Sequence, residues 1–166
     1  MIKTLLAQVK EYKTPSLLAP LCAALEVFFD MSIPFVIAKL IDQGVQAGNL
    51  AVAMKYGILM LVLATCGLIT GFLAGKFAAQ ASAGFAANLR EGMYDNIQTF
   101  AFSNIDKYST AGLVTRMTTD VTNVQNAYQM IIRIVVRAPL TIVVSMIMCF
   151  VVDQRLSLIF LAAVLI

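Results

Sequence analysis

Histidine and tryptophan are absent from this 166-residue chain, and charged residues make up only 13% of it. Without histidine, the chain cannot form a His-ligated metal site or the Ser-His and Cys-His pairs of nucleophilic catalysis. Soluble domains usually have about a quarter of their residues charged. The low charge therefore excludes a water-soluble globule, a disordered chain and a nucleic-acid-binding protein.

Cysteine is also scarce. Cys22, Cys66 and Cys149 all lie in apolar stretches and lack the spacing of metal ligands. We therefore expect packed, unreactive thiols and no metal site.

Hydrophobic residues instead fill 60% of the chain, and its mean hydropathy is +0.86. A transmembrane helix needs about 20 mainly apolar residues. Four segments have or begin such a run, at about 16–38, 53–75, 134–152 and 156–166. The last run is still apolar at Ile166, after about half the thickness of a bilayer. We therefore expect 14–166 to be a partial transmembrane domain from a longer protein.

Basic residues predict the orientation, because cytoplasmic connections carry an excess of lysine and arginine. One side of the membrane has six of them and the other has three. The six are Lys3, Lys10, Lys13, Lys76, Arg133 and Arg137, and the three are Lys39, Lys55 and Arg155. This favours a multi-pass plasma-membrane protein with a cytoplasmic N-terminus. Residues 1–13 have an amphipathic pattern that predicts a helix lying in the membrane interface.

Residues 76–133 have neither the hydrophobicity of a span nor the glycine and proline content of a linker. Their apolar residues instead recur at helical spacing in two runs. The runs are Phe77, Ala81, Phe85, Leu89, Met93, Ile97 and Phe100, then Leu113, Met117, Val121, Val124, Tyr128, Ile131 and Val135. We expect two long helices, at about 51–102 and 113–152, that continue from the membrane as a cytoplasmic stalk.

A break at the tip of this stalk separates the two runs. Ser103 followed by Asp106 fits a helix capping box, and Gly112 fits a helix stop. We therefore expect a short helix across the tip that presents Asp106, Lys107 and Tyr108 to a partner. An ordinary helical-hairpin loop is the alternative.

Charged residues at helical spacing mark two further features. Glu26 and Asp30 lie four residues apart in the first span, where carboxylates are costly and usually face a cavity or a partner. They are candidates for a substrate cavity that takes a cationic, apolar molecule; pairing with an unseen helix or a water-filled cleft is equally open. A direct Glu26–Arg137 pair requires both side chains to be extended. Arg116 and Asp120, also four apart, are expected to pair on the stalk surface.

Small residues form a stripe along the second predicted helix, where they allow close packing of helices. The stripe consists of Gly67, Gly71, Gly75, Ala79, Ala83 and Ala87, widened by Ala74, Ala78, Ser82 and Ala86. We favour plain packing over a surface on which helices slide.

The segment from Ile105 to Val121 reads IDKYSTAGLVTRMTTDV, and Leu89-Arg90 precedes it on the stalk. It resembles the first intracellular loop of ABC exporters, which has an aromatic-Asp stretch, then Thr-Gly, then Leu-x-x-Arg with an Asp four residues later. Two departures are Ile105, where an aromatic residue is common, and Ala111, which is inserted between Thr110 and Gly112. The resemblance covers essentially the whole chain.

The resemblance implies an all-α membrane protein, namely the first three and a half helices of a six-helix ABC exporter transmembrane domain. The parent would be a half-transporter that exports drugs, lipids or peptides. It would work as a homo- or heterodimer with an ATP-binding domain that uses ATP and Mg²⁺, on the same chain or on a partner. Its partners would be the lipid bilayer and an amphiphilic or cationic small molecule, with no nucleic acid. The coupling helix docking on the ATP-binding domain would comprise Ser103, Asn104, Ile105, Asp106, Lys107, Tyr108, Ser109 and Thr110.

The segment itself has no phosphate-binding loop. Gly71-Phe-Leu-Ala-Gly-Lys76 has too few residues between its glycines and no Ser or Thr after the lysine, so we assign no catalytic residue. Two other functions stay open. One is a self-contained, proton-coupled multidrug exporter that uses Glu26, although such proteins have short loops. The other is a non-transporting membrane scaffold whose stalk docks a cytosolic partner.

Overall fold

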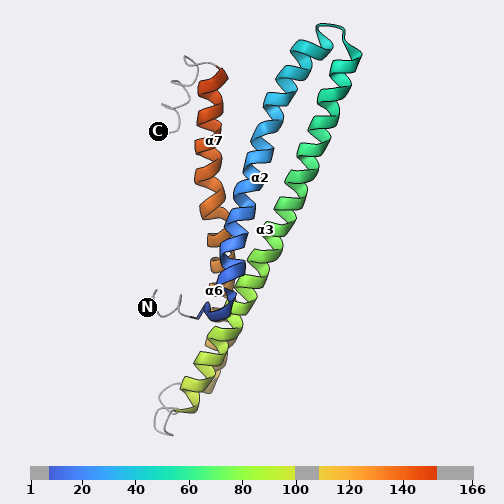
Figure 1. The fold of residues 1–166 in the computed structure, drawn as a ribbon. Coiled ribbons are helices and arrows are strands. Elements are labelled where there is room, and N and C mark those ends of the chain that lie inside the picture. Colours follow the sequence, from blue (N-terminus) through green and yellow to red (C-terminus); the bar gives the residue numbers. More distant parts are fainter. Residues whose placement is uncertain (1–7, 100–108, 153–166) are drawn as a thin grey trace. The chain divides into compact units, whose positions relative to one another are not determined.

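The computed structural model describes residues 8–99 and 109–152. Nearly all of these residues are helical, and no strand occurs among them. The elements in chain order are η1 (Lys10–Tyr12), α2 (Lys13–Lys39), η2 (Leu40–Val45), α3 (Leu50–Gln98), α5 (Thr110–Thr115), η3 (Arg116–Asp120), α6 (Val121–Met130), η4 (Ile131–Val135) and α7 (Val136–Val152) (Figure 1). Segments η2, η3 and η4 are π-helical. The predicted all-α class is confirmed.

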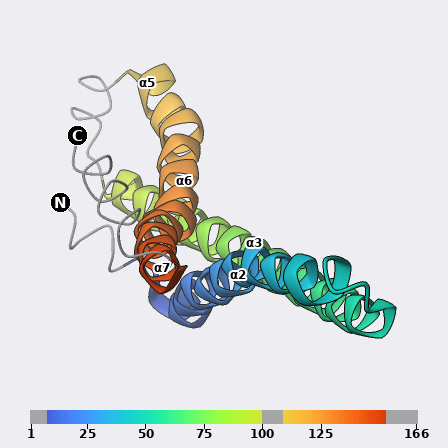
Figure 2. The ribbon, with the colours of Figure 1, turned by 90° about the horizontal axis from the view of Figure 1, so that it is seen from above.

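Three helical stretches are long and apolar enough to cross a membrane: Lys10–Val45, Leu50–Gln98 and Ala111–Val151. They correspond to the first three predicted spans, whereas the fourth, 156–166, lies outside the described residues. The third stretch runs from α5 to α7 through η3 and η4 (Figure 2). With 49 residues, α3 is about 73 Å long at 1.5 Å per residue. A hydrocarbon core is about 30 Å thick, so α3 extends well beyond a single span.

The chain divides into two compact units, which we describe separately. Unit 1 comprises Met1–Ala19 and Gly75–Arg133, and unit 2 comprises Pro20–Ala74 and Ile134–Ile166. The predicted interfacial helix 1–13 belongs to unit 1 but stays a prediction, since residues 1–7 lie outside the described part.

Unit 1 has a core of small residues closed by two aromatic rings. Ala19, Ala78, Ala81 and Ile132 form a buried cluster against which Phe77 and Tyr128 pack. The ring of Tyr128 also stacks on Phe85, with ring centroids 4.6 Å apart. Its hydroxyl lies 3.0 Å from Oγ of Ser16. Tyr128 thus joins α6 to both α2 and α3 within this unit.

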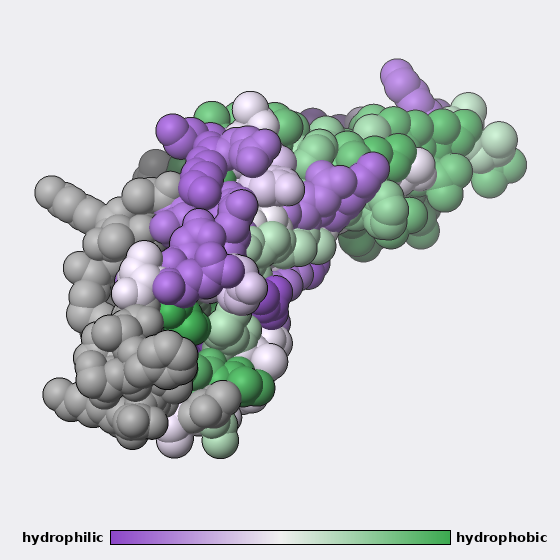
Figure 3. Space-filling model, turned by 90° about the horizontal axis from the view of Figure 1, so that it is seen from below, coloured by the Kyte–Doolittle hydropathy of each residue, from purple (hydrophilic) through white to green (hydrophobic). Residues whose placement is uncertain are grey.

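Unit 2 buries few side chains of its own. Cys22, Ala23, Val27, Val36 and Ala74 are buried, whereas Leu61, Leu68 and Phe72 on α3 are at least 70% exposed. Exposed apolar surface of this extent requires lipid or further helices against it. Unit 1, by contrast, carries a group of hydrophilic side chains, which Figure 3 shows in a view from below.

The packed face of α3 differs from the predicted stripe of small residues. Ala79, Ala83 and Ala87 are exposed; the buried residues are Ala74, Ala78, Ser82 and Ala86. Each residue turns a helix by about 100°, so a stripe with a period of four drifts by about 40° at every step. After the five steps from Gly67 to Ala87 the drift is about 200°. The strict stripe is therefore wrong as a packing surface beyond the membrane segment.

A similar shift occurs in the second apolar run. Ile131 and Val135 were expected on the packed face but are exposed, and Ile132 is buried instead. These residues form η4, in which the wider π-helical turn rotates the side chains that follow relative to an α-helix.

The predicted helix stop at Gly112 is wrong. Ser109, with φ −51° and ψ 137°, is the N-cap of α5. Its Oγ accepts a hydrogen bond of 3.2 Å from the backbone N–H of Gly112, so Gly112 lies in the first turn of a helix. A helix across the tip cannot include Ser109, whose backbone is not helical. The capping pair Ser103 and Asp106 lies outside the described residues.

We expect Phe85→Ala to lower the free energy of unfolding by about 3–5 kcal/mol, because Phe85 is 2% exposed and stacks on Tyr128. Phe72→Ala is the matched control, since Phe72 is 71% exposed. Thermal unfolding of the full-length protein in detergent micelles measures both. Equal melting temperatures for the two variants would contradict the assigned core.

Candidate functional site

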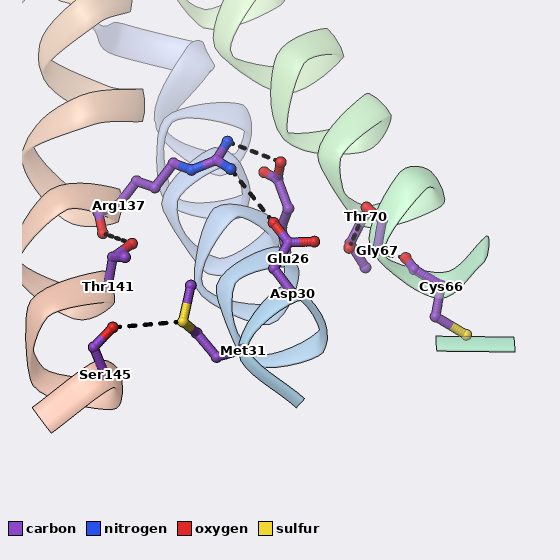
Figure 4. A network of polar contacts seen from close by, with 9 residues as sticks. All are labelled: Glu26, Asp30, Met31, Cys66, Gly67, Thr70, Arg137, Thr141 and Ser145. Carbon is purple, nitrogen blue, oxygen red and sulfur yellow. Dashed lines mark hydrogen bonds and ion pairs between the residues drawn. The ribbon is translucent and has the colours of Figure 1, made fainter. Parts of the chain in front are cut away.

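Two carboxylates of α2 share one guanidinium of α7 in unit 2 (Figure 4). Nη1 of Arg137 donates to Oε1 of Glu26 at 2.8 Å, and Nη2 reaches Oδ2 of Asp30 at 3.5 Å. The side chain of Glu26 is 13% exposed, against 38% for Arg137 and 42% for Asp30. Glu26–Arg137 is therefore the tight, shielded pair, and Asp30 makes the longer and more exposed contact.

Glycines of α3 lie against the same carboxylates. A methyl group added at Gly71 would lie 2.9 Å from Oε1 of Glu26, and one added at Gly67 would lie 3.3 Å from Oδ1 of Asp30. Gly67 precedes Gly71 along α3, whereas its neighbour Asp30 follows Glu26 along α2. The two helices therefore run antiparallel in this unit. Both glycines belong to the predicted small-residue stripe, so in the membrane segment that stripe makes room for charged side chains.

Glu26, Asp30 and Arg137 together carry one formal negative charge, and Arg137 is the cation that pairs with both carboxylates among the described residues. Oε2 of Glu26 is buried and has no hydrogen-bond partner among the described residues. Isolated charges inside a span are expensive, and they usually face a partner or a water-filled cavity. Arg137 is the partner that the structure provides, and it offsets only one of the two carboxylates.

Two further polar contacts lie along α7, one within the helix and one that joins it to α2. Oγ1 of Thr141 donates to the backbone carbonyl of Arg137 at 2.8 Å, and Oγ of Ser145 donates to Sδ of Met31 at 3.6 Å. Pro34 has no N–H to donate to the carbonyl of Asp30, four residues earlier on α2. The backbone beside Asp30 is thus an interrupted stretch of helix.

The structure brings together both residues predicted for the substrate cavity. It also forms the Glu26–Arg137 pair, which requires both side chains to be extended. The contact from Arg137 to Asp30 and the role of the two glycines were not foreseen. The sequence did contain a signal for the glycines. Two carboxylates lie four residues apart on one helix, and two glycines lie four residues apart on the next.

Most residues predicted for coupling, Ser103–Tyr108, lie outside the described residues. Of the remaining two, Ser109 caps α5 and Thr110 begins it. Arg116 and Asp120 are the first and last residues of η3, and both are exposed. Their pairing stays a prediction.

Sequence reasoning did not foresee a contact that ties η3 to α3. Nε of Arg90 donates to the backbone carbonyl of Met117, and Nη2 donates to Oγ1 of Thr122, each at 3.3 Å. The N–H of Val121 bonds to the carbonyls of Arg116 and Thr118 instead of that of Met117. Arg90 thus donates to a backbone carbonyl that the π-helical turn leaves without the N–H of Val121.

Comparison with known proteins identifies the class. The family of ABC transporter transmembrane regions matches residues 16–166, and the chain belongs to this family. It is 30% identical over 159 residues to the uncharacterized ABC transporter ATP-binding protein YfiB of Bacillus subtilis, covering 96% of this chain and 28% of that protein. It is 26% identical over 165 residues to the uncharacterized ABC transporter ATP-binding protein Rv1273c of Mycobacterium tuberculosis, covering 99% of this chain and 28% of that protein.

A third relative carries a more specific name. The chain is 31% identical over 105 residues to the ATP-dependent lipid A-core flippase of Aromatoleum aromaticum, covering 63% of this chain and 17% of that protein. The chain thus spans little more than a quarter of the length of its first two relatives, and less of the third.

We expect Arg137→Met to destabilise the protein, because it leaves the shielded carboxylate of Glu26 without a counter-ion. Breaking a buried ion pair costs about 3–5 kcal/mol, and the partial exposure of Arg137 places this variant at the lower end. The double variant Glu26→Gln/Arg137→Met should regain part of the loss. Asp30→Asn should change stability by only about 0–1 kcal/mol, since its contact is long and exposed.

Thermal unfolding of the full-length protein in detergent measures this series. A melting temperature of Arg137→Met equal to that of the wild type would show that the ion pair does not stabilise the protein.

Proposed function

We propose that this chain is part of the substrate-translocating domain of an ATP-driven exporter. The observation that carries the proposal is the length of α3 in a member of the ABC transmembrane family: 49 residues, far more than one span requires. A helix that continues past the membrane provides a rigid connection through which a cytosolic domain can move the spans. The stretch Ala111–Val151, of 41 residues, provides a second such connection.

The ATP-binding domain would belong to the remainder of a longer protein or to a partner chain. Relatives named as ATP-binding proteins are several times longer than this chain, which supports this arrangement. The predicted coupling residues Ser103–Thr110 would contact that domain, and ATP with Mg²⁺ would bind there. The distribution of basic residues supports a cytoplasmic N-terminus in the plasma membrane. A second half-transporter, identical or different, would complete the dimer.

For the substrate, the charges of unit 2 favour an amphiphilic cation. Glu26 and Asp30 carry one formal negative charge more than Arg137 neutralises, within a segment whose other surroundings are apolar. A lipophilic cation would supply the missing positive charge. The flippase among the relatives makes a lipid the second candidate, with Arg137 as the group that would meet an anionic headgroup.

The gene should continue beyond the codon for Ile166 with two further spans, and a Gly-x-x-x-x-Gly-Lys-Ser/Thr motif should follow them or occur in a partner chain. The full-length protein in proteoliposomes should then accumulate tetraphenylphosphonium only with Mg-ATP. A protonophore should leave this transport unchanged, and substitution of the motif lysine should abolish it. Transport driven by a proton gradient without ATP would instead support the proton-coupled alternative that uses Glu26. A protein that binds ATP but transports nothing would support a scaffold.

We also expect Glu26→Gln to weaken transport of tetraphenylphosphonium by about tenfold, the equivalent of about 1.4 kcal/mol of lost attraction. Asp42→Asn is the matched control, because Asp42 is an exposed carboxylate of η2 in the same unit. Movement of a fluorescent phospholipid between leaflets should stay unchanged in both variants. Loss of lipid movement with intact cation transport in Glu26→Gln would contradict the assigned substrate class.

A further inference from the structure

The N-terminal segment of the described chain packs against two glycines of α3, Gly84 and Gly92, which we call the notch. In unit 1, the ring of Tyr12 covers Gly84 so closely that a methyl group at position 84 would overlap three ring atoms. A methyl group at Gly92 would lie 3.3 Å from Nε2 of Gln8. Gly84 and Gly92 lie eight residues apart, which is about 80° around α3, and both contact the N-terminal segment. Each therefore leaves room for a side chain of the N-terminal segment.

Asn88 lies midway between the two glycines and binds the segment through its backbone. Its side-chain Nδ2 donates to the carbonyl of Gln8 at 2.9 Å, and Asn88 is only 7% exposed. Val9, next in the chain, is also 7% exposed. A buried amide bonded to a main-chain carbonyl fixes the position of the segment along α3, because sliding by one turn would leave both groups unpaired.

The backbone turns sharply between these contacts. Lys10 has φ +36°, which a residue with a side chain rarely adopts. The N–H of Tyr12 donates to the carbonyl of Val9 at 2.8 Å, and the carbonyl of Tyr12 accepts from Oγ of Ser16 at 2.6 Å. Such a backbone persists only where surrounding contacts hold it. The contacts to Gly84 and Asn88 meet that requirement.

We propose that residues 8–12 form a clasp that stays closed during transport, so that the N-terminal segment and the part of α3 in unit 1 move as one body. The inference rests on the proposed exporter function, because it assigns the clasp a part in transmitting the ATP-driven movement. Opening the clasp would uncouple ATP hydrolysis from transport. Lys10 and Glu91 add only an exposed contact of 3.7 Å, so the clasp depends on the notch more than on charge.

The first test uses full-length transporter in proteoliposomes and compares transport per ATP hydrolysed. Gly84→Ala should lower this ratio about tenfold with basal ATP hydrolysis within twofold of the wild type, because the added methyl group displaces Tyr12. Gly75→Ala is the matched control on the same helix, as nothing lies within 4 Å of its added methyl group. Tyr12→Ala should lower the ratio similarly, and the double variant should be no worse than either single variant.

The second test closes the clasp covalently and does not depend on how Gly84→Ala folds. In a cysteine-free background, Tyr12→Cys/Gly84→Cys should transport poorly until a short bismaleimide links the two positions. Linking should then restore transport, whereas treated single-cysteine variants should not recover. Failure of the link to form, or a linked protein that hydrolyses ATP without transport, would overturn the clasp.

The outcomes separate the clasp from the proposed function. Wild-type protein with ATP-driven transport, in which Gly84→Ala behaves like Gly75→Ala, would refute the clasp alone. Wild-type protein without ATP-driven transport would refute the exporter function, and the role of the clasp in coupling with it.

Discussion

Close approach to the backbone of α3 is the constraint on which both units depend. In unit 2, Gly67 and Gly71 leave room for the carboxylates of Asp30 and Glu26. In unit 1, Gly84 leaves room for the ring of Tyr12, and the small residues Ala78 and Ala81 form part of the core. Larger side chains at these positions would push the neighbouring segments away. Small residues drive close packing of membrane helices for the same reason, since dispersion and polar contacts there fall off steeply with distance.

Charge compensation adds a second requirement in unit 2. Glu26 is largely shielded and would be costly without Arg137, whereas Asp30 is exposed enough to tolerate a longer contact. Pro34 and Pro139 interrupt the hydrogen bonding of α2 and α7 near these charged residues. In this site one arginine contacts two carboxylates, and only the contact to Asp30 is long and exposed enough to be broken at low cost.

The π-helical segments explain why the stretch from α5 to α7 does not behave as a single regular helix. In η3 the N–H of Val121 bonds to the carbonyls of Arg116 and Thr118. Arg90 donates to the carbonyl of Met117, which lies between them. Segment η4 moves the buried position from Ile131 to Ile132. Such turns often lie at functional places in helices. In this chain they flank α6, which carries Tyr128 and its contacts to α2 and α3.

The sequence by itself determined the class of protein and the positions of the long helices. Runs of apolar residues and their helical spacing predicted the second and third long helices at about 51–102 and 113–152, and the structure begins and ends them within a few of these residues wherever it describes them. It also singled out Glu26 and Asp30, since charge within a span is rare and costly.

Tertiary structure alone decided which neighbours these residues meet. The Glu26–Arg137 pair spans 111 positions of sequence, and the Tyr12–Gly84 contact joins distant parts of the chain. The packed face of α3 also needed the structure, because a fixed period of four drifts around a helix of 3.6 residues per turn. Local patterns record which residues must be buried, whereas the path of each helix decides what they are buried against.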